Sequence, residues 1–355
     1  MDVRTTAPGK LVIAGDYAVL EGAPAVVMAL NRRAQVTLVD SADGEFCIDA
    51  PEMDVQQAHA RLEAGKLCWQ DAGVGERLNL VTAVLEHLAG QDVLTDGFHA
   101  HLDTQAFFSA YRRRDKLGLG SSAALVVALV GAIHARQGRK PPDLEAMLAM
   151  HRQMQGGRGS GLDIAASLLG GVLVYRLQND GRPHAVQTSW PQDLALCCVW
   201  SGRPASTGKA LGQLAQWRRN HPADYDKLMN ELTVEASAVA AALQADDAVA
   251  MVDGMAAYAS GLERLGQASG IDIVCAEHRA VADMADDCGV VYKTCGAGGG
   301  DVGIACATDT ERLKHFAKQV DSAGFYVLGV NIDVQGLAVE TSAPSNRRQP
   351  WTTCA

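Results

Sequence analysis

Residues 116–124 read Lys-Leu-Gly-Leu-Gly-Ser-Ser-Ala-Ala and lead directly into an apolar run that extends to Ile133. Gly118 and Gly120 allow the backbone to adopt positive φ and to approach a ligand closely. The apolar run has the length and composition of a helix that would begin near Ser121. Because a helix start offers unpaired N–H groups and a positive dipole end, the stretch predicts a phosphate site. A glycine turn with a serine N-cap before a core helix is the alternative interpretation.

Two better-known phosphate-binding patterns do not fit the chain. The dinucleotide fingerprint requires a third glycine where Ala123 stands, and the glycine cluster at 296–301 carries Asp301 at that place. A P-loop is nearly formed at 202–210, but it has one residue too many between its glycines. Its last residue is Ala210, where Ser or Thr would hold Mg²⁺. Neither pattern therefore explains the stretch at 116–124.

The composition indicates a globular protein that binds neither nucleic acid nor membrane. The 355 residues suffice for two domains with their own cores, and the net charge of −10 argues against a nucleic-acid surface. No apolar run approaches the roughly 20 residues of a membrane span, and no secretory signal opens the chain. The nine cysteines include no Cys-x-x-Cys pair, which favours reduced, mostly buried thiols and a cytoplasmic location.

The hydrophobic pattern predicts a mixture of strands and helices. Residues 7–17 are predicted as a turn, a short strand and a second turn, which would place Lys10 near a tight bend. Two strands are expected at 25–30 and 35–40, whereas 41–75 shows no clear period. Further strands are expected at 97–102, 171–175, 194–200, 290–293, 302–306, 326–330 and 337–340. Helices are expected at 78–88, 143–155, 164–169, 207–265 and 271–288, with one more after a cap at Asp309 or Thr310.

A further glycine-rich stretch at 156–163 ends in Asp163, just before a short predicted helix. A carboxylate there is favourable at a helix N-terminus through the dipole, and it could equally be a catalytic group presented by a loop. His151 lies on the apolar face of the preceding predicted helix, so we interpret it as a packed histidine.

Three stretches in this order resemble the GHMP small-molecule kinase family. They are Ala-Pro-Gly-Lys at 7–10, Gly-Leu-Gly-Ser-Ser-Ala-Ala at 118–124, and Lys-Thr-Cys-Gly-Ala-Gly-Gly-Gly-Asp at 293–301. The resemblance implies an α+β, two-lobed GHMP kinase fold with the active site in the cleft between the lobes. A ribosomal-protein-S5-like N-terminal domain would cover 1–190, a ferredoxin-like C-terminal domain 191–345, and a tail 346–355.

Within the family, the phosphomevalonate kinase branch is the most similar. Its pattern is matched at 9–20, by Lys116 before the phosphate loop, by Gly-Ser-Gly-x-Asp at 159–163, and by Trp-Ser-Gly-Arg-Pro-Ala-Ser-Thr at 200–207. The departures from common family residues are Asp16 for glutamate, Leu117 for threonine, and Thr294-Cys295 for Pro-Ser. In addition, Arg152, Gln153 and Gln155 occupy the helix on which mevalonate kinases carry a Mg²⁺-binding glutamate.

The resemblance implies ATP-dependent phosphoryl transfer, with Mg²⁺, to the phosphate of phosphomevalonate. An alcohol acceptor, as in mevalonate kinase, and a catalytically silent ligand sensor are the alternatives. A monomer or homodimer acting on a small molecule is expected. The implied catalytic residues are Lys10, Lys116 and Asp163. The implied ATP-binding residues are Gly118, Leu119, Gly120, Ser121, Ser122 and Ala123, with Ser122 as the Mg²⁺ ligand. The implied acceptor-binding residues are Lys10, Arg158, Ser160, Gly161, Ser206, Thr207, Gly298 and Asp301.

Overall fold

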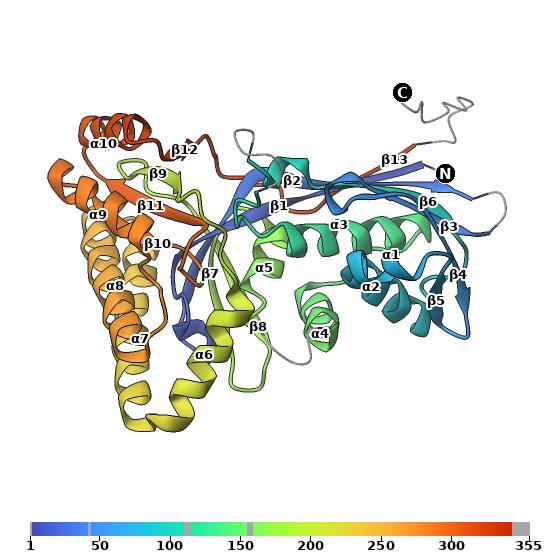
Figure 1. The fold of residues 1–355 in the computed structure, drawn as a ribbon, viewed down its shortest axis with the longest axis horizontal. Helices are drawn as coiled ribbons and strands as arrows, with labels where there is room; N and C mark the ends of the chain where they lie inside the picture. The colour runs from blue at the N-terminus through green and yellow to red at the C-terminus, as the bar shows by residue number, and fades with distance from the viewer. Residues whose placement is uncertain (1, 42–43, 110–114, 155–158, 343–355) are drawn as a thin grey trace.

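The computed structural model describes residues 2–41, 44–109, 115–154 and 159–342, and it has two α/β parts side by side (Figure 1). The first part is built on a sheet with the order β13-β1-β2-β6-β3-β4-β5, in which β7 and β8 extend from β2. Its strands are β1 (Asp2–Ala14), β2 (Ala25–Asp40), β3 (Phe46–Ala50), β4 (Val55–Glu63), β5 (Lys66–Trp69), β6 (Phe98–Asp103), β7 (Val172–Leu177), β8 (Pro183–Thr188) and β13 (Ala338–Ser342).

One face of this sheet is covered by α1 (Ala72–Arg77), α2 (Asn79–Gly90), α3 (Ser121–Arg136), α4 (Leu144–Met154) and α5 (Leu162–Leu169) (Figure 1). The central helix α3 packs against β1 and β2. Every residue from Ala123 to His134 is buried. A helix that is apolar all round is stable only inside a core, which explains why α3 lies between the sheet and the other helices.

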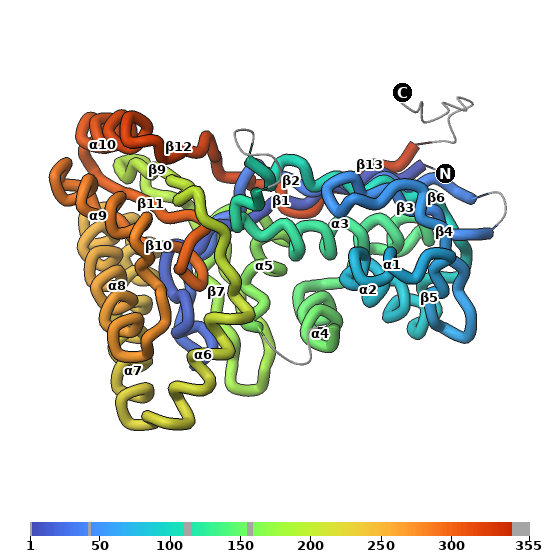
Figure 2. The backbone as a smooth tube through the Cα atoms, in the orientation of Figure 1, coloured from blue at the N-terminus to red at the C-terminus, as the bar shows by residue number. Residues whose placement is uncertain are grey.

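The second part contains an antiparallel sheet with the order β10-β11-β9-β12. Its strands are β9 (Ala195–Trp200), β10 (Val291–Thr294), β11 (Val302–Ala307) and β12 (Tyr326–Leu328). Its helices are α6 (Thr207–Asn220), α7 (Pro222–Gln244), α8 (Ala248–Ser269), α9 (Ala276–Cys288) and α10 (Thr310–Ser322). Side chains of β9 and β11 alternate between a core shared with α9 and α10 and a core shared with α7 and α8. The tube in Figure 2 shows α7 and α8 running side by side.

The predicted bend at Lys10 is wrong, because β1 continues from Asp2 to Ala14. Pairing of β1 with β13 ends at Thr6, and its register with β2 shifts between Pro8 and Gly9. Pro8 has no N–H to donate, so it is tolerated where one neighbouring strand has ended and the ladder is irregular. Lys10 is therefore held on a strand.

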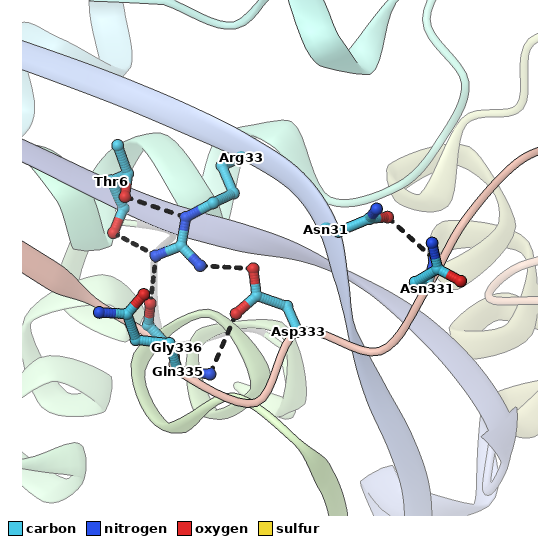
Figure 3. Close-up of polar contacts among 7 residues, drawn as sticks. All are labelled: Thr6, Asn31, Arg33, Asn331, Asp333, Gln335 and Gly336. Atoms are coloured by element: carbon cyan, nitrogen blue, oxygen red, sulfur yellow. Dashed lines mark hydrogen bonds and ion pairs between the residues drawn. The ribbon is translucent and has the colours of Figure 1, made fainter.

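The two strands expected at 25–30 and 35–40 are one strand, β2. The polar residues between them are paired with a distant segment (Figure 3). Arg33 donates to the hydroxyl and the carbonyl of Thr6, both at 2.9 Å, and forms an ion pair with Asp333. Asn331 N–H donates to the Asn31 side chain at 2.9 Å. The break in hydrophobic alternation is thus compensated by residues about 300 positions later in the chain.

Residues 41–75 contain three strands that the pattern did not predict: β3, β4 and β5. Their backbone is irregular, with positive φ at Asp54, Gln57 and Ala64 and a register shift between β3 and β4. Such irregularities disturb the two-residue period from which a strand is recognised.

The chain returns to the first sheet at its last described strand, since β13 pairs antiparallel with β1. The domain boundary near 190 stays a prediction, and the expected tail at 346–355 lies outside the described residues.

The cysteines of the described ranges are free thiols, and all but Cys68 are buried, as expected. Within those ranges, the helices are all too short or too polar to cross a membrane.

Candidate active site

The glycine stretch forms a turn that opens α3. Gly120 is the N-cap residue with φ of 83°, and no side chain caps this helix. The first helical bond runs from Ala124 N–H to Gly120 C=O at 3.2 Å, so the amides of 121–123 precede the helical ladder. Ser122 is exposed at this end, whereas Ala123 is buried. The serine N-cap alternative is therefore wrong, and the helix start is open to an anion.

Lys10 lies against this turn. Its N–H donates to the Leu119 carbonyl at 2.8 Å. A Cβ atom placed on Gly120 would lie 2.9 Å from Lys10 Cγ, and one placed on Gly296 would lie 3.9 Å from Lys10 Nζ. The Lys10 side chain thus runs from the phosphate turn toward the third glycine stretch, which brings the three predicted motifs together.

Asp301 connects the phosphate turn with the segment before α6. Its carboxyl group packs so tightly on Gly118 that a Cβ there would lie 2.3 Å from Asp301 Cγ. Its Oδ1 accepts a hydrogen bond from Ala205 N–H at 3.0 Å, next to Ser206 and Thr207 at the start of α6. Burial raises the pKa of Asp301, and the opposing effects of the Ala205 hydrogen bond and the Lys10 charge do not cancel this shift.

Asp16 and Lys293 form a fully buried ion pair beside the site, a contact that the sequence pattern did not predict. Asp16 also accepts the Gly296 N–H, and its backbone carbonyl accepts the Tyr258 hydroxyl. Burial acts to lower the pKa of Lys293, but the charge of Asp16 outweighs it and raises the pKa overall. Asp16 lies in the stretch 9–20 and Lys293 begins the stretch 293–301, so both positions could be identified from the sequence, although their contact could not.

Asp163 occupies the first turn of α5, not the preceding loop. It is half-buried, and Gly161 before it is the N-cap residue with φ of 78°. Asp163 Oδ1 accepts from Ile164 N–H at 3.0 Å. His151 is buried as predicted; burial lowers its pKa, and the charge of Asp163 opposes that shift. The carboxylate is thus held at a helix start in a partly desolvated position.

The sequence is similar to those of known proteins. Residues 79–171 match the N-terminal domain of GHMP kinases. This match supports the resemblance of the chain to the GHMP kinase family. Phosphomevalonate kinase of Streptomyces sp. (strain CL190) is 28% identical to this chain over 93% of the chain and 97% of the relative. Mevalonate kinase of Thermococcus sibiricus is 24% identical over 96% of the chain and 99% of the relative.

A solved structure has the same GHMP kinase fold, which confirms the predicted fold class. Streptococcus pneumoniae phosphomevalonate kinase, in complex with phosphomevalonate and AMPPNP, superposes with a TM-score of 0.76. The alignment covers 94% of this chain and 99% of that chain, at 20% sequence identity. At this identity the likeness concerns the fold alone.

Other predicted site residues have contacts of their own outside the phosphate turn. Lys116 is exposed, and its Nζ lies 5.9 Å from the centre of the Phe108 ring. A Cβ on Gly298 would lie 2.4 Å from the Ile273 carbonyl, so Gly298 serves backbone packing there. Arg158 lies outside the described residues.

Two cavities, of about 290 and 600 Å³, lie away from the glycine-rich motifs. Both cavities are lined by His59 and other residues near β4, and neither lining includes a predicted site residue. Across the described ranges, no group of three His, Cys, Asp or Glu side chains is arranged to hold a metal. Mg²⁺ keeps several waters and binds phosphates, so a site for it at the phosphate turn needs few protein oxygens.

Proposed function

We propose that this protein is a kinase of the mevalonate pathway that transfers a phosphoryl group from ATP to the phosphate of (R)-5-phosphomevalonate, giving 5-diphosphomevalonate. The observation that carries the proposal is the position of Lys10 between the phosphate turn at Gly120 and the third motif at Gly296. A cation there can neutralise charge on the transferred group. The similarity to the Streptomyces phosphomevalonate kinase over nearly the whole chain supports this acceptor.

In this proposal the open start of α3 binds the ATP phosphates through the amides of residues 121–123. The exposed Ser122 hydroxyl is the protein ligand for Mg²⁺, which would offset charge on the phosphates. Phosphoryl transfer depends mainly on alignment and charge neutralisation, so most of the catalysis is assigned to Lys10 and the turn. Lys116 would add positive charge nearby.

The role of Asp163 follows from the acceptor. A phosphate monoester has a second pKa near 6 and is mostly dianionic at neutral pH. It needs no base to remove a proton, so Asp163 orients the reacting groups in this proposal. Ser160, Gly161, Ser206, Thr207, Gly298 and Asp301 would line the acceptor side, together with Arg158.

Mevalonate kinase is the second candidate, because the Thermococcus sibiricus relative aligns over 96% of the chain. An ADP-release assay with matched concentrations of phosphomevalonate, mevalonate, homoserine and galactose decides between the two. We expect kcat/KM for phosphomevalonate to exceed that for mevalonate by at least about 100-fold, or roughly 2.7 kcal/mol. Preferential turnover of mevalonate would replace the proposal with the second candidate.

A further inference from the structure

Two side chains outside the glycine-rich motifs hold the backbone that leads to Asp163. Arg152, on the last turn of α4, donates from Nε and from one terminal nitrogen to the Gly159 carbonyl, each at 3.3 Å. Its other terminal nitrogen donates to the Gly181 carbonyl at 3.3 Å. One guanidinium thus ties α4 to the loop before Asp163 and to the turn between β7 and β8.

The neighbouring carbonyl is held from the sheet side. Tyr175, on β7, is fully buried, and its hydroxyl donates to the Ser160 carbonyl at 2.5 Å. Gly161 follows immediately, and a Cβ there would lie 2.0 Å from Leu148 Cδ1 of α4. The carbonyls of 159 and 160 therefore have fixed partners, and the next residue packs on a helix, so the backbone is held directly before α5.

Tyr175 interacts electrostatically both with Arg152 and with Asp163, whose carboxylate the two side chains would position. Burial raises the pKa of Tyr175, the charge of Asp163 acts in the same direction, and the charge of Arg152 opposes it. The Tyr175 hydroxyl is therefore within electrostatic reach of both the Arg152 guanidinium and the Asp163 carboxylate. When packing and hydrogen bonds fix the residues around a functional side chain, that side chain keeps its productive geometry at little entropic cost.

We infer that Arg152 and Tyr175 are positioning residues, which fix the start of α5 and thereby the direction of the Asp163 carboxylate. The inference rests on the proposed role of Asp163 in phosphoryl transfer. The hydrogen bonds of both side chains described above go to the carbonyls of Gly159, Gly181 and Ser160, not to the phosphate turn or Lys10. Their removal should therefore lower kcat while leaving the KM for ATP nearly unchanged.

Three substitutions separate positioning from general stability. Tyr175→Phe removes one hydroxyl and keeps the ring in the core. Arg152→Lys keeps the charge but loses the forked donor geometry, and Arg152→Ala removes both. The control is Arg182→Met, which removes an exposed arginine from the same β7–β8 turn, where it pairs with Asp180 at 3.3 Å.

We expect about a tenfold lower kcat for Tyr175→Phe and Arg152→Lys, and a larger loss for Arg152→Ala, with the KM for ATP within twofold of wild type. Millimolar ethylguanidine should restore part of the kcat of Arg152→Ala and have no effect on Tyr175→Phe. Arg182→Met should match wild type. Unchanged kcat in the Arg152 and Tyr175 variants, or equal changes in kcat and both KM values, would overturn the inference.

Hydrogen exchange gives a readout that does not depend on the acceptor. Amides of residues 160–165 should exchange about tenfold faster in Tyr175→Phe and Arg152→Ala than in wild type, while amides of 121–126 stay unchanged. Absence of this local effect would overturn the inference even if the enzyme is inactive on phosphomevalonate. Conversely, a wild-type enzyme that prefers another acceptor defeats the proposed function only, and the kcat comparison is then made with that acceptor.

Discussion

Asp16 Oδ2 lies 2.9 Å from Lys293 Nζ, and neither side chain is exposed to solvent. The pair joins the turn after β1 to strand β10, and so connects the first motif with the third. The other carboxylate oxygen accepts the N–H of Gly296, the glycine that lies beside Lys10. The geometry around Lys10 thus depends on a charge pair in the core.

Removing one member of this pair should destabilise the protein strongly. Lys293→Met leaves the Asp16 charge buried without its partner, and we expect a loss of about 3–5 kcal/mol in the free energy of unfolding, measured in urea. The double variant Asp16→Asn/Lys293→Met should lose less than the sum of the two single variants. Arg312→Met, which removes an exposed pair with Asp309, should cost at most about 1 kcal/mol. Strict additivity of the buried pair would contradict this prediction.

Gly118 should be sensitive to a single added methyl group. It has φ of +75°, and Asp301 occupies the space where a Cβ would lie. Gly138, just after the other end of α3, has φ of +65° and open space around it. We expect Gly138→Ala to cost about 1–2 kcal/mol in unfolding free energy with normal activity. Gly118→Ala should cost more and also raise the KM for ATP. Equal behaviour of the two variants would show that the contact with Asp301 is unimportant.

His278 should make stability depend on pH below neutrality. Its Nε2–H donates to the Gly300 carbonyl, so its Nδ1 accepts from Tyr292, each at 2.8 Å. Burial lowers its pKa, so between about pH 6.5 and that lowered value the unfolded chain binds a proton that the folded chain does not. Stability should therefore fall as pH decreases through this window, by up to about 1.4 kcal/mol per pH unit, and be insensitive to His278 above it. Urea denaturation at pH 7.5, 6.5 and 5.5 measures the slope.

His278→Gln retains a donor and an acceptor but cannot titrate, so its slope between pH 6.5 and 5.5 should be shallower than that of wild type. His315→Gln, at an exposed position, is the control for the substitution itself. The prediction fails if the His278 variant keeps the full wild-type slope.

Asp163 should matter for turnover more than for nucleotide binding. Its carboxylate is half-buried at the start of α5, so Asp163→Asn keeps its size and removes its charge. Without the carboxylate charge the reacting groups should be misaligned. We therefore expect kcat to fall by at least about 100-fold, with little change in ATP affinity. Steady-state kinetics and nucleotide titration measure the two effects. Asp193→Asn, at an exposed site, is the control, and a kcat within a few-fold of wild type would reject the role of Asp163.

Arg158 is predicted to bind the acceptor phosphate. A guanidinium can form two parallel hydrogen bonds with a phosphate, and a charge-assisted contact is worth roughly 1.5–3 kcal/mol. Arg158→Met should therefore lower kcat/KM for phosphomevalonate by about ten- to hundredfold while the KM for ATP changes little. If both KM values rise together, the residue belongs to the nucleotide site; if neither changes, it does not bind substrate.

The helix starts illustrate how much could be predicted from sequence. Gly120 before Ser121 and Asp309 before Thr310 mark the first residues of α3 and α10, because turn and capping preferences are local. The strands of residues 46–69 were missed, since register shifts and positive φ angles hide their period. The continuity of β2 was also missed, because it depends on Arg33 meeting a segment near Asp333.

The sequence by itself determined the order and identity of the three glycine-rich motifs, and with them the resemblance to the GHMP kinases, because such turns need particular residues at neighbouring positions. Only the tertiary structure decided which residues meet: Lys10 with Gly120 and Gly296, Asp301 with Gly118, and Asp16 with Lys293. The last pair is separated by 277 positions in the chain. Contacts over such separations arise from the packing of whole strands and helices, which local residue preferences do not encode.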